Sequence, residues 1–351
     1  MKIWAMTAPK KPLERIEVAD PTPTGTEVIV RTTHCGLCHS DLHLWEGEYN
    51  LGGGKRMNIL ERGVSFPRAP SHEIAGTVVA IGPDATGVAI GDTRIVYPWI
   101  GCGHCDRCRD GEENLCATMK PIGVITHGGM AEQVVVPHPR YLVDPGTLDP
   151  GLAATYACSG ITVNGAIRKL EIRDPSSPVV LVGAGGLGLA AVAMLRAKGH
   201  RTIVVVDVNP DKQQAALEAG ATTFVDGATA DLTGALRAAA GGPLLYAVDF
   251  VNTDTTARAV FDSLGKGGRM VMVGVAGGEL TLSLAGMVFV PRTVMGTAMG
   301  SIQDLKDVVA LAQTGKLAPV PTERMPIDRV NEAFDRLKDG RVTGRIVLEY
   351  D

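Results

Sequence analysis

The pattern of hydrophobic and polar positions divides the chain into two parts of different character. Up to about residue 145, short β-branched runs alternate with Gly, Pro and charged turns, as in EVIVRTTHCG, AGTVVAIG, TRIVY and AEQVVVP. Short β-branched runs separated by turns favour a compact, mostly β domain. From about residue 178, apolar strands alternate with helical stretches, beginning with VVLVGAGGLGLAAVAMLRAKG and TIVVVD. Buried strands that alternate with helices predict an α/β, doubly wound parallel sheet.

Further strands of this sheet are expected at TTFVD, YAVDFV and RMVMVGV, with helices at DKQQAALEAG and TTARAVFDSLGKGG. The last part of the chain predicts two amphipathic helices, in SIQDLKDVVALAQTGKLAP and in DRVNEAFDRLKDGRVTGRIVLEYD, followed by a final strand.

Composition limits the classes of partner. A length of 351 residues is enough for two domains. The net charge of −4 gives no electrostatic reason to expect nucleic acid or an anionic membrane as a partner. The N-terminal sequence lacks the apolar region of a signal peptide, and no later stretch has the roughly 18 apolar residues of a membrane span. We therefore expect a cytoplasmic protein that acts on a small molecule.

A glycine-rich turn predicts a dinucleotide site. The sequence GAGGLG fits GxGxxG and lies between an apolar strand and a helix, so that a pyrophosphate can rest on the helix N-terminus. The residues of this turn are Gly183, Gly185, Gly186, Leu187 and Gly188. Asp207 ends the next strand, where its carboxylate suits an adenosine ribose and repels a 2′-phosphate, so we expect NAD rather than NADP. The alternatives are an ordinary glycine turn and an Asp207 that only ends a strand.

Seven cysteines, an odd number, argue against a disulfide framework and favour metal thiolates. Four of them have the spacing CxxCxxCx7C, namely Cys102, Cys105, Cys108 and Cys116. Four thiolates can surround one Zn²⁺ and leave no open position, which predicts a structural zinc. His104 lies between two of these cysteines and is expected to be a solvated loop residue. The acidic residues of the lobe argue against a nucleic-acid-binding zinc ribbon.

Three cysteines remain, at positions 35, 38 and 158, together with His72 in APSHEIAG. Two cysteines and a histidine can give a zinc site with one open coordination position, which is typical of a catalytic zinc. A CxxC redox pair of Cys35 and Cys38 is the alternative.

The motifs CHSDLHLWEG, SHEIAG, the four-cysteine lobe, CSGITV, GAGGLG and TGRIVLEY resemble, in this order, those of the zinc-dependent medium-chain alcohol dehydrogenases. CHSDLH is especially similar to the yeast-type enzymes. The resemblance covers essentially the whole chain and implies that Cys38, His72 and Cys158 bind a catalytic zinc, in addition to the structural zinc. It implies a Rossmann domain at 159–297 inserted into a GroES-like catalytic domain at 1–158 and 298–351, with the zinc lobe at about 98–118.

The resemblance also assigns roles to individual residues. Ser40 would hydrogen-bond the alcohol oxygen and His43 would pass its proton to solvent, while Asp41 would orient the zinc-bound histidine and Glu73 would lie behind the zinc. Cofactor contacts are expected from His39, Thr162, Leu187, Lys212 and Arg345. Trp45 and Trp99 are either walls of the substrate pocket or core aromatics, and Cys35 is expected in the core.

The chain departs from the family pattern in two places. Ser71 replaces the usual glycine before His72, and residues 50–68 form a longer segment than in the yeast-type enzymes. The basic residues of that segment either select an acidic substrate or are solvated.

The activity implied is reversible, NAD-linked oxidation of an alcohol to an aldehyde or ketone, by a homo-oligomer that is a tetramer or a dimer. The alternatives are a physiological aldehyde or ketone reductase with a specialised substrate, and an NAD-binding protein that has lost turnover. A zinc-independent quinone reductase would lack the seven metal-binding positions.

Overall fold

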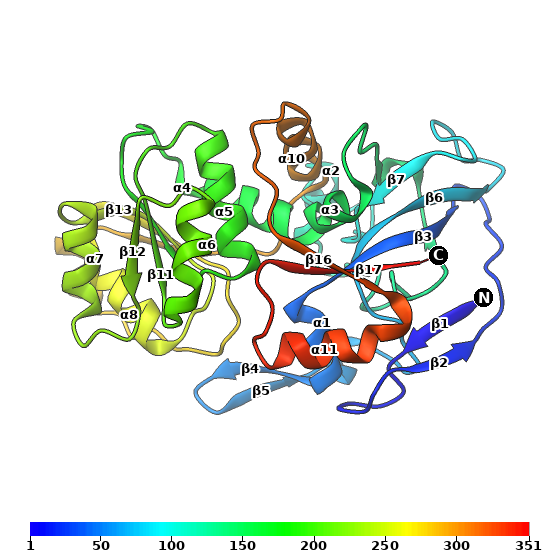
Figure 1. Cartoon of the computed structure of the whole chain (residues 1–351), viewed down its shortest axis with the longest axis horizontal. Helices are drawn as coiled ribbons and strands as arrows, with labels where there is room; N and C mark the ends of the chain where they lie inside the picture. The colour runs from blue at the N-terminus through cyan, green and yellow to red at the C-terminus, as the bar shows by residue number, and fades with distance from the viewer. Residues whose placement is uncertain (351) are drawn as a thin grey trace.

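The computed structural model describes residues 1–350, so Asp351, the last residue of the predicted returning segment, lies outside it. Figure 1 shows two lobes, one built on a six-stranded sheet and the other on a seven-stranded sheet, with both chain termini in the second lobe. None of the helices within residues 1–350 combines the length and the hydropathy that a membrane-crossing segment needs.

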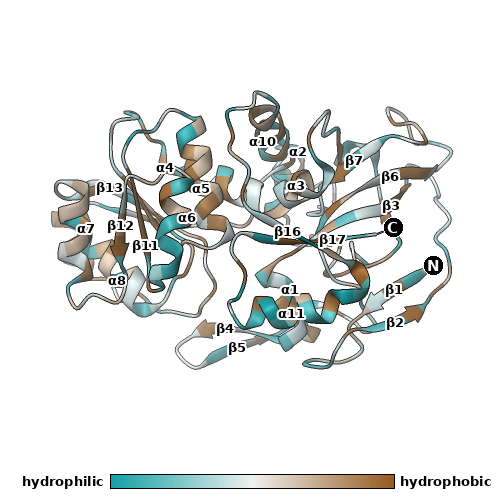
Figure 2. Ribbon diagram, in the orientation of Figure 1, coloured by the Kyte–Doolittle hydropathy of each residue, from teal (hydrophilic) through white to brown (hydrophobic). Residues whose placement is uncertain are grey.

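The six-stranded sheet is parallel throughout and has the order β12-β11-β10-β13-β14-β15. Its strands are β10 (Val179–Val182), β11 (Ile203–Asp207), β12 (Thr223–Asp226), β13 (Leu244–Asp249), β14 (Leu264–Met272) and β15 (Thr293–Gly296). The helices of this lobe are α4 (Ile161–Leu170), α5 (Gly186–Ala197), α6 (Gln213–Glu218), α7 (Leu232–Ala240), α8 (Asp254–Ser263) and α9 (Leu284–Phe289). Strands β10 and β11 are Val-rich because helices cover both faces of a parallel sheet, and Figure 2 shows hydrophobic colour on β11 and β12. The predicted Rossmann sheet is confirmed.

The seven-stranded sheet is mainly antiparallel, with the order β16-β17-β3-β6-β7-β9 and with β8 paired to β3. Its strands are β3 (Val28–Leu37), β6 (Glu73–Ile81), β7 (Thr93–Val96), β8 (Gln133–Val136), β9 (Leu142–Val143), β16 (Thr322–Pro326) and β17 (Arg345–Glu349). The C-terminal strand β17 lies between β3 and β16, so the end of the chain completes the N-terminal lobe. This arrangement confirms a Rossmann sheet inserted into a mostly β domain.

Smaller elements surround this second sheet. The strand pairs are β1 (Lys2–Ala5) with β2 (Glu14–Glu17), and β4 (Glu48–Gly52) with β5 (Lys55–Asn58). The helices are α1 (His39–Glu46), α2 (Asp106–Arg109), α3 (Pro150–Thr155), α10 (Ile302–Gln313) and α11 (Val330–Lys338), and a π-helical turn spans Tyr156–Gly160. Short 3-10 turns lie at Leu60–Arg62, Glu113–Leu115, Pro139–Tyr141, Pro210–Lys212 and Ile327–Arg329.

The sequence analysis did not predict β4, β5, β15, β16 or α9. Each has at most six residues, and the hairpin tip, Gly52 to Gly54, is all glycine. Short elements carry too few hydrophobic positions to show a period, so their pairing partners decide their structure.

The core of the second lobe depends on β6, whose Ile74 is fully buried between Cys35 of β3 and Val96 of β7. We expect Ile74→Ala to lower the free energy of unfolding by about 2 to 5 kcal/mol, because it removes buried methyl groups and leaves a cavity. The urea midpoint measures this change. The control is Ile90→Ala, whose side chain is 65% exposed and should leave the midpoint nearly unchanged. Equal shifts for the two variants would contradict the assignment of Ile74 to the core.

Candidate functional site

Three separated segments bring two thiols and an imidazole together. Cys38 is the N-cap of α1, His72 immediately precedes β6, and Cys158 lies in the π-helical turn. Their ligand atoms all lie within 4.8 Å of one another, and all three residues are buried. The Cys38 and Cys158 sulfurs are 3.8 Å apart, and His72 Nε2 is 3.2 Å from the Cys158 sulfur.

These distances and donor types fit a zinc ion. Two sulfurs bound at about 2.3 Å in tetrahedral geometry lie about 3.8 Å from each other. A buried cluster of two thiols and an imidazole has little reason to persist without a cation, because thiolates are costly to bury alone. The side chains of Cys38, His72 and Cys158 would thus supply three ligands and leave a fourth position open.

Asp41 supports this cluster from behind. Its carboxylate is fully buried and accepts hydrogen bonds from the backbone N–H groups of Cys38 and Ser71, each at 2.9 Å. It also lies 3.6 Å from His72 Nδ1, a buried atom with no hydrogen-bond partner. Burial lowers the pKa of His72, but Asp41 and Cys38 together outweigh burial and raise the pKa overall. Asp41 therefore holds the backbone at Cys38 and at Ser71, next to His72. It also faces His72 Nδ1, the ring nitrogen opposite the one that contacts the Cys158 sulfur.

Ser71 occupies the position where the sequence departs from glycine. It has a φ of +73°, which is unusual for a residue with a side chain. Its hydroxyl donates to the Gly36 carbonyl at 2.9 Å, so a buried hydrogen bond offsets part of the backbone cost. The serine at position 71 therefore does not displace His72 from the cluster with Cys38 and Cys158.

Glu73 and Arg345 form a buried ion pair beside the cluster. Burial raises the pKa of Glu73 to about 7, although the Arg345 charge opposes this shift. A Cβ atom on Gly186 would lie 2.7 Å from Arg345 Cδ. Arg345 thus connects the metal cluster with the glycine turn of the other domain.

The polar residues of α1 face the same region. Ser40 Oγ lies 3.7 Å from the Cys38 sulfur, and His43 Nδ1 lies 3.1 Å from Glu46 Oε2. Burial lowers the pKa of His39, and the positive charges of Arg345 and Lys212 lower it further. The positive charges of Arg345 and Lys212 therefore act on His39 and favour its neutral imidazole.

The glycine turn has the geometry that a dinucleotide needs. Gly183 has a φ of +98°, and a Cβ atom on Gly188 would lie 1.8 Å from the Gly183 carbonyl oxygen, so close packing of strand and helix requires glycine there. Asp207, at the end of β11, accepts from the Ala184 N–H at 2.7 Å and lies 3.3 Å from Lys212 Nζ. In the same lobe, Thr162 is buried in α4, and Leu187, within the glycine turn, is half-buried.

The four-cysteine lobe forms a second metal-binding cluster. The sulfurs of Cys102, Cys105, Cys108 and Cys116 all lie within 4.8 Å of one another, with Cys105 and Cys108 at 3.5 Å. Backbone N–H groups point at the sulfurs of Cys102 and Cys116, each at 3.4 Å, as expected for thiolates. His104 turns away and its Nδ1 contacts the Cys102 carbonyl at 2.9 Å.

The sequence left the roles of Trp45, Trp99 and Cys35 open, and the structure shows where each of them lies. The Trp99 ring is 5.2 Å from the His72 ring, at the cluster. Trp45 is not at the metal cluster: it donates to the Lys11 carbonyl at 2.6 Å and lies under Lys338. It packs against a second hydrophobic core, formed by buried residues of β1, α1 and α11 among others. Cys35 is fully buried, as expected. Sequence reasoning missed Tyr49, whose ring lies 5.0 Å from the His43 ring and whose only signal was its position shortly after CHSDLH.

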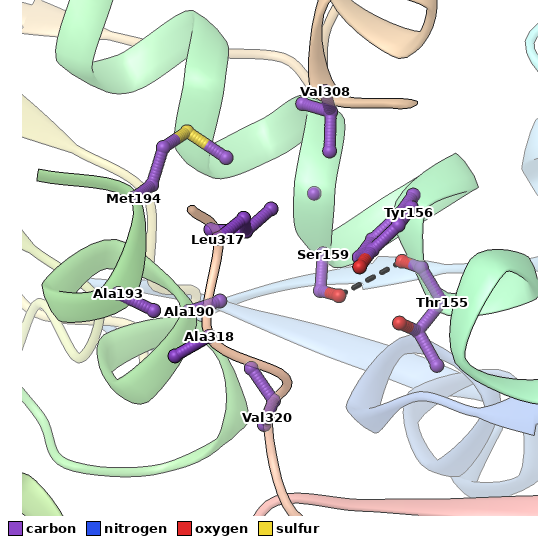
Figure 3. A pocket seen from close by; sticks show the side chains of 11 residues that line it. Thr155, Tyr156, Ser159, Ala190, Ala193, Met194, Val308, Leu317, Ala318 and Val320 are labelled. Atoms are coloured by element: carbon purple, nitrogen blue, oxygen red, sulfur yellow. Dashed lines mark hydrogen bonds between the residues drawn. The ribbon is translucent and has the colours of Figure 1, made fainter. Parts of the chain in front are cut away.

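A crevice behind the π-helical turn has no room for a substrate. Thr155, Tyr156, Ser159 and Gly160 line it together with apolar residues of α5 and of the segment after α10, as Figure 3 shows. Its volume of about 10 Å³ is about that of one water-sized probe. Cys158 is not among its lining residues, so the crevice is separate from the metal cluster.

The fold and the two clusters thus define a two-domain, dinucleotide-binding metalloprotein. Residues 24–145 match the family described as alcohol dehydrogenase GroES-like domain, and residues 186–314 match the zinc-binding dehydrogenase family. An NAD-dependent alcohol dehydrogenase of Sulfurisphaera tokodaii is 35% identical over 340 residues, which are 96% of each chain. A D-arabinose 1-dehydrogenase (NADP(+)) of Saccharolobus solfataricus is 33% identical over 96% of this chain and 94% of its own.

Among solved structures, the alcohol dehydrogenase of the archaeon Aeropyrum pernix is similar over 100% of both chains, with a TM-score of 0.89 and 29% identity. The chain therefore belongs to the zinc-dependent alcohol dehydrogenases of the medium-chain family. This confirms the resemblance drawn from the motifs.

The two clusters can be tested separately by metal analysis. We expect Cys108→Ser to lose the lobe zinc and to retain the zinc at Cys38, His72 and Cys158, since no ligand is shared between the clusters. Cys35→Ser is the control, because Cys35 belongs to neither cluster. Elemental analysis of purified, dialysed protein should show a loss of about half the zinc for Cys108→Ser and none for Cys35→Ser. Loss of all zinc from a folded Cys108→Ser protein would contradict two independent sites.

Proposed function

We propose that the protein catalyses the reversible, NAD-linked oxidation of an alcohol to an aldehyde or ketone at the cleft between its two lobes. One observation carries this proposal: a buried cluster of three zinc-binding side chains, Cys38, His72 and Cys158, lies beside the glycine turn of a dinucleotide site. When bound there, zinc acts as a Lewis acid that lowers the pKa of the alcohol, and NAD accepts the hydride.

The protein's own residues would orient the substrate and move the proton. Ser40 lies beside the Cys38 sulfur, where its hydroxyl can bond the alcohol oxygen. His43, one turn further along α1 and paired with Glu46, can receive the proton and release it toward solvent. Asp41 holds the His72 side of the cluster, and the Glu73–Arg345 pair supports it from behind.

Cofactor contacts are proposed on both sides of the cleft. His39 would contact the pyrophosphate, Lys212 and Arg345 would hold ribose and phosphate, and Thr162 and Leu187 would flank the nicotinamide. Asp207 supports NAD over the NADP of the sugar dehydrogenase relative, because a carboxylate at the end of β11 repels a 2′-phosphate. Lys212, the cation next to it, is already paired with this carboxylate.

Of the four basic residues in residues 50–68, Lys55 and Arg62 are exposed and the other two are engaged within the protein. Arg56 pairs with Glu48 at 2.6 Å, and Arg68 is buried against Ser65 at 2.9 Å. Two aromatic side chains lie near the proposed site: the Trp99 ring beside His72 and the Tyr49 ring beside His43. We therefore propose a neutral alcohol, ketone or aldehyde as the substrate, with the physiological direction set by concentrations.

Domain boundaries and location complete the proposal. We place the boundaries at 158/159 and 297/298, because Cys158 ends the zinc-ligand set and the chain re-enters the seven-stranded lobe through the segment that contacts Tyr97 at Gly300. A cytoplasmic location is supported by seven cysteines that form no disulfide.

The activity is tested by NADH consumption with a panel of aliphatic and aromatic aldehydes, ketones and carboxylate-bearing analogues, and by NAD reduction with the alcohols and D-arabinose. We expect turnover of neutral compounds that a zinc chelator abolishes.

Ser40→Ala should lower kcat by about 100-fold or more without loss of zinc, because it removes a proton-transfer contact. Ser65→Ala, which is remote from the cluster, should be unaffected. Absence of turnover in protein that holds zinc and NADH would favour a binding protein.

We further propose that the protein is a homo-oligomer, a dimer or a tetramer, that associates through the edge of the six-stranded sheet. Strand β15 pairs only with β14 among the described strands, so its other edge is unpaired. The adjacent α9 exposes Leu284 (83%), Val288 (76%) and Phe289 (75%). An unpaired strand beside exposed large apolar side chains suits a second copy of the chain.

Replacement of Phe289 by a charged residue should weaken this association. We expect Phe289→Glu to shift the protein toward monomer in sedimentation velocity, because the substitution places a charge in an apolar contact. Ile90→Glu, also on an exposed apolar residue but in the other lobe, is the control. A wild-type protein that sediments as a monomer would refute the proposal.

A further inference from the structure

The β4–β5 hairpin of the zinc-binding lobe reaches across to the Rossmann domain. It follows α1 directly and, as Figure 1 shows, extends toward the six-stranded lobe. At its far end, Asn50 Nδ2 donates to the Ala276 carbonyl at 3.4 Å. Residues 274–279 follow the carboxyl end of β14, which is the edge of a doubly wound sheet where ligands bind.

The contact is close enough to require glycine on both sides. A Cβ atom on Gly52 would lie 2.9 Å from the Gly277 carbonyl oxygen and 2.9 Å from Glu279 Cγ. A Cβ atom on Gly277 would lie 2.4 Å from Asn50 Cγ. By contrast, Gly54, at the same tip, has open space around it. The hairpin tip therefore fits against residues 276–279 by close backbone approach.

Tyr49 precedes Asn50 on the same strand, so its side chain points to the opposite face of the hairpin. Its ring lies 5.0 Å from the His43 ring. His43 lies on α1, the helix whose N-cap is the candidate zinc ligand Cys38. One strand thus carries the contact with the Rossmann domain and a side chain that packs beside His43.

On its own side, the hairpin is firmly attached to the zinc-binding lobe. The Ile59 N–H donates to the Gly47 carbonyl at 3.2 Å, and Ile59 is buried in the second core. The Glu48–Arg56 pair joins the two strands. Toward the Rossmann domain, the contact consists of the Asn50 hydrogen bond and the packing of the glycine tip.

We propose that the β4–β5 hairpin is a clasp across the cleft, in which Asn50 and Gly52 fasten the tip to residues 276–279 and thereby hold Tyr49 as the outer wall of the substrate site. Asn50 is a positioning residue and Tyr49 a specificity-determining one. The clasp has two consequences. It slows the separation of the lobes that releases the cofactor, and it limits the length of substrate that fits between Tyr49 and the metal cluster.

This inference rests on the proposed function for its substrate limit but not for its effect on the cofactor. The test compares zinc-loaded wild type with Asn50→Asp, which keeps the side-chain shape but removes the donor, and with Gly52→Ala. Gly54→Ala is the matched control, because Gly52 and Gly54 both have positive φ, at +83° and +76°, and only Gly52 contacts the Rossmann domain. NADH release is measured by stopped-flow fluorescence without alcohol, and kcat/KM is measured over the straight-chain alcohols from ethanol to octanol.

We expect Asn50→Asp and Gly52→Ala to release NADH roughly fivefold faster, the change that corresponds to one lost hydrogen bond. Both should also raise kcat/KM for octanol relative to ethanol, as should Tyr49→Ala, while Gly54→Ala behaves as wild type. Asn50 is exposed, so Asn50→Asp carries the test even where Gly52→Ala lowers stability.

Two results would overturn the clasp: NADH release that is unchanged in Asn50→Asp, or an equal effect in Gly54→Ala. If wild type oxidises no alcohol, the proposed function fails, while the NADH release rates still decide whether the hairpin holds the lobes together.

Discussion

The structure depends on one constraint: the side chains of Cys38, His72 and Cys158 are buried together, and their two thiols and one imidazole are the donor set of a zinc site. They come from the start of α1, the start of β6 and a π-helical turn, so the ion would link the segments on which the lobe is built. A buried polar cluster without its cation leaves costly unsatisfied groups. The fully buried Asp41 and the Glu73–Arg345 pair are arranged around this point. The hydrogen bonds of Asp41 run to the backbone beside two of the three ligands, which makes the cluster part of the fold.

The position of the cluster explains why the two lobes function together. Arg345 lies on the last strand, pairs with Glu73 and touches the region of Gly186 at the start of α5. His39 and Lys212 lie in the same region, where burial and the charges of Arg345 and Lys212 lower the pKa of His39. The chemistry of an alcohol and a nicotinamide needs the two reactants held in contact and shielded from water. The β4–β5 hairpin supplies a further contact between the lobes, from Asn50 to the Ala276 carbonyl.

Much of the fold and the site could be predicted because the signals are local. The strand, glycine turn and helix around Gly183 occur in one continuous stretch, and four cysteines within fifteen residues define the lobe. Other features depend on residues far apart in the chain. The Glu73–Arg345 pair joins positions separated by 272 residues, and Arg345 was predicted only as a cofactor contact. The hairpin has no strong strand pattern, since its tip is glycine and its strands are polar, so the approach of Tyr49 to His43 was visible only in the structure.

The central claim is that zinc is held by two cysteines and one histidine between the lobes. The most direct measurement is the zinc K-edge X-ray absorption spectrum of the Cys108→Ser protein, in which the lobe site is removed. We expect the remaining zinc to have two sulfur neighbours and one imidazole nitrogen, with the fourth position filled by a light atom. A spectrum with four sulfur neighbours, or with none, would contradict it.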